Sequence, residues 1–180
     1  MAQNTKLDTA QVNKINFLSE PKERDNITEY KVEPPFHISG HGTRVGIDPG
    51  TKNLGIALLY PENKSLYLFK VKLERDDDPV KRMVDAQMAL QSCIQYHGYD
   101  PIATIEGASF GNYYRQVELA EQRAAMALWF YARNFKVVFG APKSIRKAVF
   151  GNGNEKNPWD NLDDDLAAAL GACYYNSSKK

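Results

Sequence analysis

The stretch from residue 44 to residue 60, RVGIDPGTKNLGIALLY, constrains the fold more than any other part of the chain. Val45 and Ile47 alternate with Gly46 and Asp48, which is the period of a β-strand, and the next residues, PGTKN, are typical of a turn. The apolar run LGIALLY predicts a second strand beside the first. The chain therefore places one carboxylate, Asp48, at the tip of a strand that has to be buried.

The elements that follow predict a mixed sheet covered by helices. The alternation in SLYLFKVKL predicts a third strand, and Asp78 before Pro79 predicts the cap and first turn of a helix. Further along, the pattern predicts a strand at 101–106, a helix at 113–134, a strand at 135–140, a short helix from 142 and a last helix from about 160. Short turns favour antiparallel pairing of the first three strands, and intervening helices favour parallel pairing of the later two. The expected fold class is α/β, with a mixed five-stranded sheet flanked by helices.

Length and composition favour one domain preceded by a tail. Of the 180 residues, 1–42 are polar without a sustained period, so we expect a flexible or arm-like tail, either disordered or ordered on a partner. Residues 43–180 then form the folded domain. The net charge of +1 indicates no partner, so a nucleic-acid site has to come from local clustering of Lys and Arg.

The same sequence predicts the compartment. The two cysteines are far apart in apolar surroundings and lack metal-type spacing, which predicts reduced core thiols. No apolar run is long enough to cross a membrane, and the N-terminus lacks the pattern of a signal or transit peptide. We expect a cytoplasmic protein, or one in an equivalent DNA-containing compartment such as an infected host cell.

Acidic residues stand at three structurally special places. Asp48 ends the first strand, Glu106 ends the fourth, and Asp160, Asp163, Asp164 and Asp165 lie at the front of the last helix. Ligands of open α/β sheets gather at the carboxyl ends of strands, and carboxylates that meet there repel one another unless a cation lies between them. Oxygen ligands suit Mg²⁺ or Mn²⁺, and two such ions about 3.5–4 Å apart can clamp a phosphodiester displacement.

Each acid also has a simpler explanation. Asp48 before Pro-Gly is typical of a turn, Glu106 can pair at a strand end, and the aspartate run suits a helix N-terminus through the helix dipole. This last explanation accounts well for Asp165, which we do not expect to be a ligand.

A series of motifs resembles one known family. GIDPGTKNLGIAL, ATIEG, LAEQRAAMAL, APKSIRKAVFGNGNEK and DDDLAAALGA occur in the order found in RuvC-type Holliday-junction resolvases of the ribonuclease H-like superfamily, over about residues 44–175. The resemblance implies a homodimeric endonuclease that depends on Mg²⁺, with Mn²⁺ as a substitute and two ions per site. It would cut four-way DNA junctions symmetrically and leave 5′-phosphate and 3′-hydroxyl ends.

The resemblance also implies roles for particular acids. Asp48 and Glu106 take the places of the two strand acids of the family, and Asp164 takes the second acidic place on the last helix. The first acidic place falls on Asn161, which departs from the family pattern; Asn161 could act through its amide oxygen, or its role could pass to Asp160 or Asp163. The metal ligands implied are Asp48, Glu106, Asp164 and Asn161, and the catalytic acids Asp48, Glu106, Asp164, Asp160 and Asp163.

DNA contacts are expected from basic and aromatic residues. The basic segment after the last strand holds Lys143, Arg146, Lys147 and Lys156, which suit phosphate neutralisation, although an ordinary solvated surface explains them equally. Phe110 matches a family position at the junction centre, and the helix start that follows adds Tyr113, Tyr114 and Arg115, which either contact DNA or close the helix onto the core. Residues 118–123 resemble the dimer helix of the family, with core packing as the alternative.

Three other functions compete with this interpretation. GIDPGT also resembles the phosphate-binding turn of actin-like and sugar-kinase-like ATPases, but those need two such lobes and 180 residues supply one. A junction- or RNA-binding relative without cleavage is the second alternative, kept open by Asn161. The third is a nuclease of the same fold that acts on other branched DNA or on RNA-containing substrates.

Overall fold

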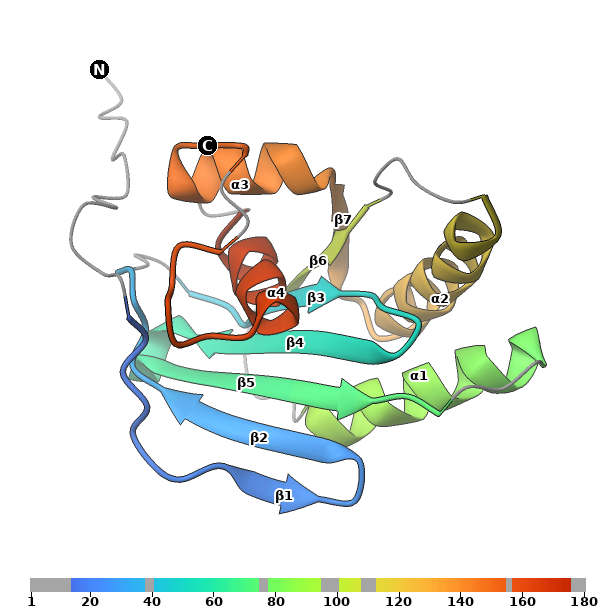
Figure 1. Ribbon diagram of the computed structural model, residues 1–180, viewed down its shortest axis with the longest axis horizontal. Coiled ribbons are helices and arrows are strands. Elements are labelled where there is room, and N and C mark those ends of the chain that lie inside the picture. Colours follow the sequence, from blue (N-terminus) through green and yellow to red (C-terminus); the bar gives the residue numbers. More distant parts are fainter. Residues whose placement is uncertain are drawn as a thin grey trace.

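The computed structural model describes residues 14–37, 41–74, 78–94, 101–107, 113–154 and 157–175. Its centre is a seven-stranded sheet in the order β1-β2-β5-β4-β3-β6-β7 (Figure 1). The strands are β1 (Lys22–Arg24), β2 (Ile27–Val32), β3 (Arg44–Asp48), β4 (Asn53–Tyr60), β5 (Ser65–Lys72), β6 (Ile102–Glu106) and β7 (Lys136–Gly140). The helices are α1 (Pro79–Cys93), α2 (Tyr113–Tyr131), α3 (Pro142–Phe150) and α4 (Asp164–Tyr175), and a 3₁₀ turn, η2 (Pro61–Asn63), joins β4 to β5.

The expected strand directions are confirmed, but the expected number of strands is wrong. β3, β4 and β5 pair antiparallel, while β6 joins β3 and β7 joins β6 in parallel. The two additional strands, β1 and β2, come from the segment that the sequence led us to treat as a tail. β2 pairs along its whole length with β5, from Ile27 opposite Val71 to Val32 opposite Leu66. Only its two end residues are buried, so it lacks the apolar alternation that marks a strand in the sequence.

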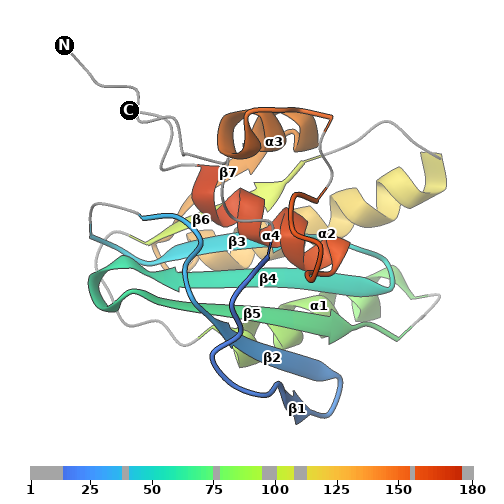
Figure 2. The ribbon, with the colours of Figure 1, turned by 60° about the vertical axis from the view of Figure 1, so that its left-hand side comes forward.

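Helices cover both faces of the sheet (Figures 1 and 2). α1 and α2 pack on one face, where Val45 and Ile47 of β3 join a core with Leu90 and Phe130. α3 and α4 pack on the other face, in a second core that also contains residues of the N-terminal segment. No helix of the described residues is long and apolar enough to cross a membrane.

Side-chain caps explain where α1 and α4 begin. The Asp78 carboxylate accepts hydrogen bonds from the backbone N–H of Val80 at 2.8 Å and of Lys81 at 3.4 Å, as expected from the Asp-Pro pair. At α4, Asp163 Oδ1 accepts from the Asp165 N–H at 3.0 Å.

Two glycines determine how closely α4 approaches the sheet. A Cβ atom on Gly46 would overlap the backbone of Ala169 and Cys173, and a Cβ on Gly55 would overlap the Asp165 carbonyl group. Gly55 lies directly opposite Asp48 in the β3–β4 pair. The absence of these two side chains therefore lets the first turn of α4 lie beside the end of β3.

Candidate active site at the carboxyl ends of β3 and β6

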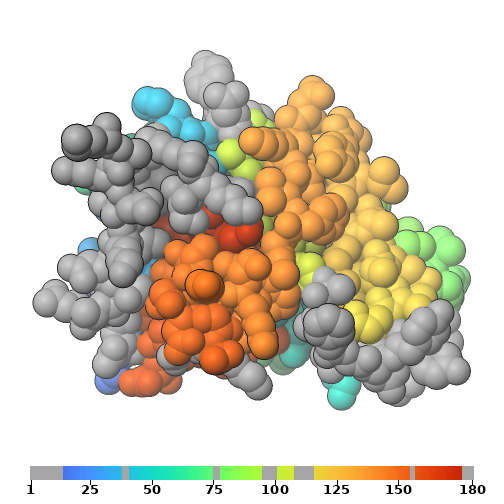
Figure 3. Space-filling model, turned by 90° about the horizontal axis from the view of Figure 1, so that it is seen from above, coloured from blue at the N-terminus to red at the C-terminus, as the bar shows by residue number. Residues whose placement is uncertain are grey.

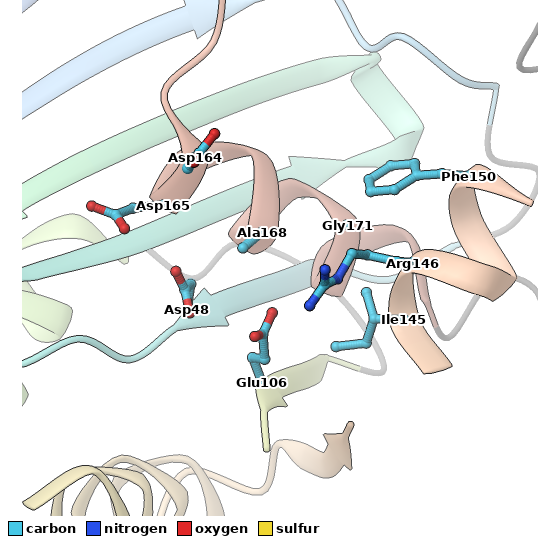
Figure 4. A pocket seen from close by; sticks show the side chains of 9 residues that line it. All are labelled: Asp48, Glu106, Ile145, Arg146, Phe150, Asp164, Asp165, Ala168 and Gly171. Atoms are coloured by element: carbon cyan, nitrogen blue, oxygen red, sulfur yellow. The ribbon is translucent and has the colours of Figure 1, made fainter. Parts of the chain in front are cut away.

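A small pocket of about 140 Å³ opens where the ends of β3 and β6 meet α3 and α4 (Figure 4). Four of its residues are acidic, one is an arginine and the rest are apolar or glycine. The lining consists of Asp48, Glu106, Ile145, Arg146, Phe150, Asp164, Asp165, Ala168 and Gly171.

Asp48 and Glu106 are neighbours because their strands are parallel and in register. Ile47 of β3 lies opposite Ile105 of β6, so the next residue of each strand reaches the same edge of the sheet. Burial raises the pKa of Glu106, while the positive charges of Arg146 and Arg123 act to lower it. A partly desolvated carboxylate of this kind is a group whose charge a cation would stabilise.

The first turn of α4 brings two more carboxylates to the pocket. Asp164 was an expected ligand; its Oδ1 accepts a hydrogen bond from the Asn157 side chain at 3.1 Å. Asp165, which we did not expect, also lines the pocket, and Figure 4 shows it on the side of Asp48. Burial raises the pKa of Asp165, and the charge of Asp163 raises it further, while Lys70 and a hydrogen bond from Asn53 act to lower it.

The other candidate ligands near α4, Asn161, Asp163 and Asp160, do not line this pocket. Both polar atoms of the Asn161 amide bond to the backbone of Ile15, with Oδ1 accepting from its N–H and Nδ2 donating to its carbonyl, each at 2.8 Å. Asp163 caps α4 and forms an ion pair with Lys70 at 2.6 Å. Asp160 is exposed in the loop before the helix. The structure therefore brings Asp48, Glu106 and Asp164 together, and adds Asp165 where the sequence suggested Asn161, Asp160 or Asp163.

The donor set of the pocket fits a hard divalent cation. Its four acids offer carboxylate oxygens from three separate elements, the ligand type that Mg²⁺ and Mn²⁺ prefer. Within the described residues, no three His, Cys, Asp or Glu side chains are already arranged around one ion position. Such an arrangement requires carboxylates to approach one another, and their repulsion opposes this until a cation is bound.

Comparison with known proteins decides the family. The profile described as "Crossover junction endodeoxyribonuclease RuvC" matches residues 44–159 of this chain. The chain belongs to the RuvC family. The match stops before α4, so the placement of the α4 acids in the site depends on the structure.

Two RuvC proteins and two solved structures of a third illustrate the similarity. RuvC from Salinibacter ruber is 31% identical over 61% of this chain and 63% of its own length. RuvC from Christiangramia forsetii is 29% identical over 75% of this chain and 80% of its own. The Thermus thermophilus RuvC structure superposes with a TM-score of 0.61 at 16% identity, over 76% of this chain and 93% of that one, which shows the ribonuclease H-like fold. A second structure of that protein, in complex with Holliday junction substrate, gives a TM-score of 0.56 over 77% and 94% of the two chains.

Two arginines lie against the acids of this RuvC-family site. Arg146, expected to contact DNA, lines the pocket, and its Nε donates to the Pro142 carbonyl at 3.2 Å. Arg123 of α2 is buried and donates from Nε to the Glu106 carbonyl at 3.0 Å. Burial lowers the pKa of Arg123, whereas Glu106 and Asp48 raise it. The sequence associated Arg123 with a dimer helix. The available signal for its burial was its helical spacing from the apolar residues Leu119 and Met126.

The remaining DNA-binding candidates are only partly described. Lys143 and Lys147 are exposed one turn apart on α3, whose orange residues form much of the face seen in Figure 3. Phe110 and Lys156 lie outside the described residues. The side chains of Tyr113, Tyr114 and Arg115 lie outside them too, although these three residues form the first turn of α2.

Proposed function

We propose that this chain is a structure-selective endonuclease that resolves four-way DNA junctions by hydrolysis of phosphodiester bonds. The observation that carries the proposal is the convergence of strand-end and helix carboxylates, Asp48, Glu106, Asp164 and Asp165, on one pocket of a RuvC-family fold. The names of the curated relatives, and the junction complex of the Thermus protein, support four-way junctions as the substrate. The proposed place of action is the cytoplasm or another DNA-containing compartment.

We further propose that the pocket holds two Mg²⁺ ions, with Mn²⁺ as a substitute. Asp48 and Glu106 would hold them from the sheet, and Asp164 and Asp165 from α4, because these side chains line the pocket. Bound metal lowers the pKa of the attacking water and stabilises the leaving 3′ oxygen, which yields 5′-phosphate and 3′-hydroxyl ends. Arg146, at the pocket wall, suits contact with the phosphate next to the cut, and Lys143 and Lys147 suit binding of the DNA backbone on α3.

A homodimer is the proposed functional assembly, because a two-fold protein suits a two-fold junction. The support from the structure is one face of α2. Small and apolar residues lie exposed there at helical spacing, namely Val117, Ala120, Ala124, Leu128 and Tyr131. The residues first associated with the dimer lie elsewhere: Leu119, Gln122 and Arg123 are buried in the core, and Glu118 faces Arg82 of α1 at 3.8 Å.

Cleavage of end-labelled synthetic junctions tests the proposal. The full-length protein should nick the four-way junction in paired symmetric positions with Mg²⁺ or Mn²⁺, and should not do so with EDTA. Linear duplex, flap and three-way substrates are the controls: preferential cutting of these forms would establish a broader branch nuclease, and tight junction binding without any cut would establish a non-catalytic relative.

A matched pair of variants connects the activity to the pocket. Asp48→Asn should abolish cleavage and keep junction binding, because it removes a carboxylate ligand and a negative charge near the phosphates. Asp160→Asn makes the same chemical change at an exposed acid outside the pocket lining and should cut like the wild type. Wild-type cleavage by Asp48→Asn would show that the proposed site is wrong.

A further inference from the structure

An N-terminal segment that precedes the RuvC-matched region is packed against the helix that carries two of the pocket acids. This segment, residues 15–36, is called the strap below; the family match begins only at residue 44. At its start, Ile15 is 3% exposed and exchanges two hydrogen bonds with the Asn161 amide, both 2.8 Å long, across 146 residues of chain. The strap is therefore fastened to the loop that leads into α4.

The other end of the strap is fastened to the last turn of the same helix. The Phe36 carbonyl accepts a hydrogen bond from Tyr174 Oη at 3.1 Å. The Phe36 ring packs edge-on against the Tyr174 ring, with centroids 5.2 Å apart. It also packs, in a tilted arrangement, against the Trp159 ring, with centroids 6.2 Å apart. Trp159 precedes α4 and Tyr174 lies in its last turn. The strap therefore contacts the chain at both ends of the helix.

The middle of the strap is part of the sheet, which fixes the position of the strap between its two contacts with the α4 region. β2 is paired over six residues with β5. From β5, Lys70 donates to Asp163 at 2.6 Å, and Asp163 in turn caps the first turn of α4 through the Asp165 N–H at 3.0 Å. The start of α4 is thus connected to the sheet through the strap and also directly.

We propose that the strap positions the active-site helix, and that Asn161 is a positioning residue for the acids at the start of α4. The inference rests on the proposed function, in which Asp164 and Asp165 hold metal. Asn161 stands three residues before Asp164 and determines where the chain enters the helix. An amide is required there because it both donates to the Ile15 carbonyl and accepts from the Ile15 N–H; an ionised aspartate at this position has no proton to donate. The asparagine at position 161, where the family pattern has an acid, is thereby explained: it binds the strap instead of a metal.

The test compares metal binding by Asn161→Ala and by a matched variant on the strap. Asn16→Ala removes the same side chain from the next residue of the strap, where its hydrogen bond, to Glu33 at 2.8 Å, lies within the strap. Mn²⁺ affinity of the full-length proteins is measured by calorimetry without DNA, together with the thermal midpoint. Asn161→Ala should bind Mn²⁺ roughly tenfold more weakly, the usual effect of losing a residue that orients metal ligands, while Asn16→Ala should match the wild type. Junction cleavage by Asn161→Ala should recover at saturating Mn²⁺.

Two outcomes would overturn the proposal. Wild-type Mn²⁺ affinity in Asn161→Ala would show that the strap does not position the acids, whatever the change in thermal midpoint. Equal weakening in both variants would show a general loss of stability. Asn161 is exposed, so its truncation leaves no cavity, and Asn161→Ser serves as a second neutral variant with the same expectation. If the wild type itself binds no Mn²⁺, the proposed function fails first. If it does bind, weaker binding by Asp48→Asn assigns the measured affinity to the pocket.

Discussion

Replacing Gly55 by alanine would test whether the close approach of α4 to the sheet builds the site. Gly55 lies opposite Asp48 on the neighbouring strand, and an added Cβ would overlap the Asp165 carbonyl and approach the Ala169 Cβ at 3.3 Å. Backbone atoms cannot rotate away as a flexible side chain can. We therefore expect the first turn of α4 to lift from β4, which moves Asp165 away from Asp48.

The size of the effect follows from the cost of overpacking. Adding a methyl group to a close-packed contact destabilises by about 1–3 kcal/mol. For a chain of this length, each kcal/mol lowers the thermal midpoint by roughly 2–4 °C, so the expected decrease is roughly 2–12 °C. The displacement of the acids should also weaken Mn²⁺ binding, because metal ligands tolerate little change in geometry.

Thermal unfolding and Mn²⁺ titration of Gly55→Ala and Gly153→Ala provide the assay. A Cβ on Gly153 would lie 3.1 Å from the Lys143 carbonyl oxygen, a tight contact but one that small shifts relieve, and its three nearest atoms all belong to α3. We expect a much smaller decrease in thermal midpoint for this control and unchanged Mn²⁺ affinity. The reasoning is refuted if Gly55→Ala keeps the wild-type midpoint and affinity.

Three further predictions concern charge and ionisation. Arg146→Ala should raise the pKa of Glu106 in the metal-free protein, because Arg146 favours the charged carboxylate; carbon NMR titration measures this, and an unchanged pKa contradicts it. Lys70→Met removes a partly exposed ion pair with Asp163 and should lower the free energy of unfolding by roughly 0.2–1 kcal/mol at low salt, and by less in 1 M NaCl. Denaturant unfolding measures this loss, and a loss that does not depend on salt would exclude the charge as its cause. Burial raises the pKa of Cys173 to about 12, so its thiol should not react with a disulfide reagent at pH 8 until the protein unfolds. Since the unfolded thiol ionises first, its contribution to stability is present below pH 9 and is lost as the pH rises toward 12.

The sheet from β3 to β7 could be predicted because its strands carry strong local patterns. Val45 and Ile47 repeat with period two, and helices separate the later strands, so strand directions followed from connection lengths. β2 could not be predicted in the same way, because its middle residues are half-exposed at the side of the sheet and its pairing with β5 joins segments about forty residues apart.

The strand acids of the candidate site were equally accessible to prediction, as was Asp164 on the helix, whereas Asp165 was not. Asp48 and Glu106 each end an apolar strand, and parallel register alone brings them together. Asp165 depends on which face of α4 meets the sheet. In the structure Ala169 and Cys173 lie against Gly46, and one further turn back along that face of the helix is Asp165. This face of α4 can approach the sheet closely because Gly46 and Gly55 have no side chains. Their effect is visible only in the packed structure.

The fastening of the strap to α4 has a consequence for how the chain reaches its native state. Ile15 contacts Asn161 and Phe36 contacts Tyr174, so the N-terminal strap is joined to α4 and to the loop before it. Contacts between residues this far apart in sequence form slowly, and during synthesis the strap waits for its partners until α4 has left the ribosome. We expect the sheet to form while α4 is still missing, so that a nascent or C-terminally truncated chain holds Asp48 and Glu106 without their partners. In such a protein the capacity to cut DNA would arise only after α4 has been made and has docked on the sheet.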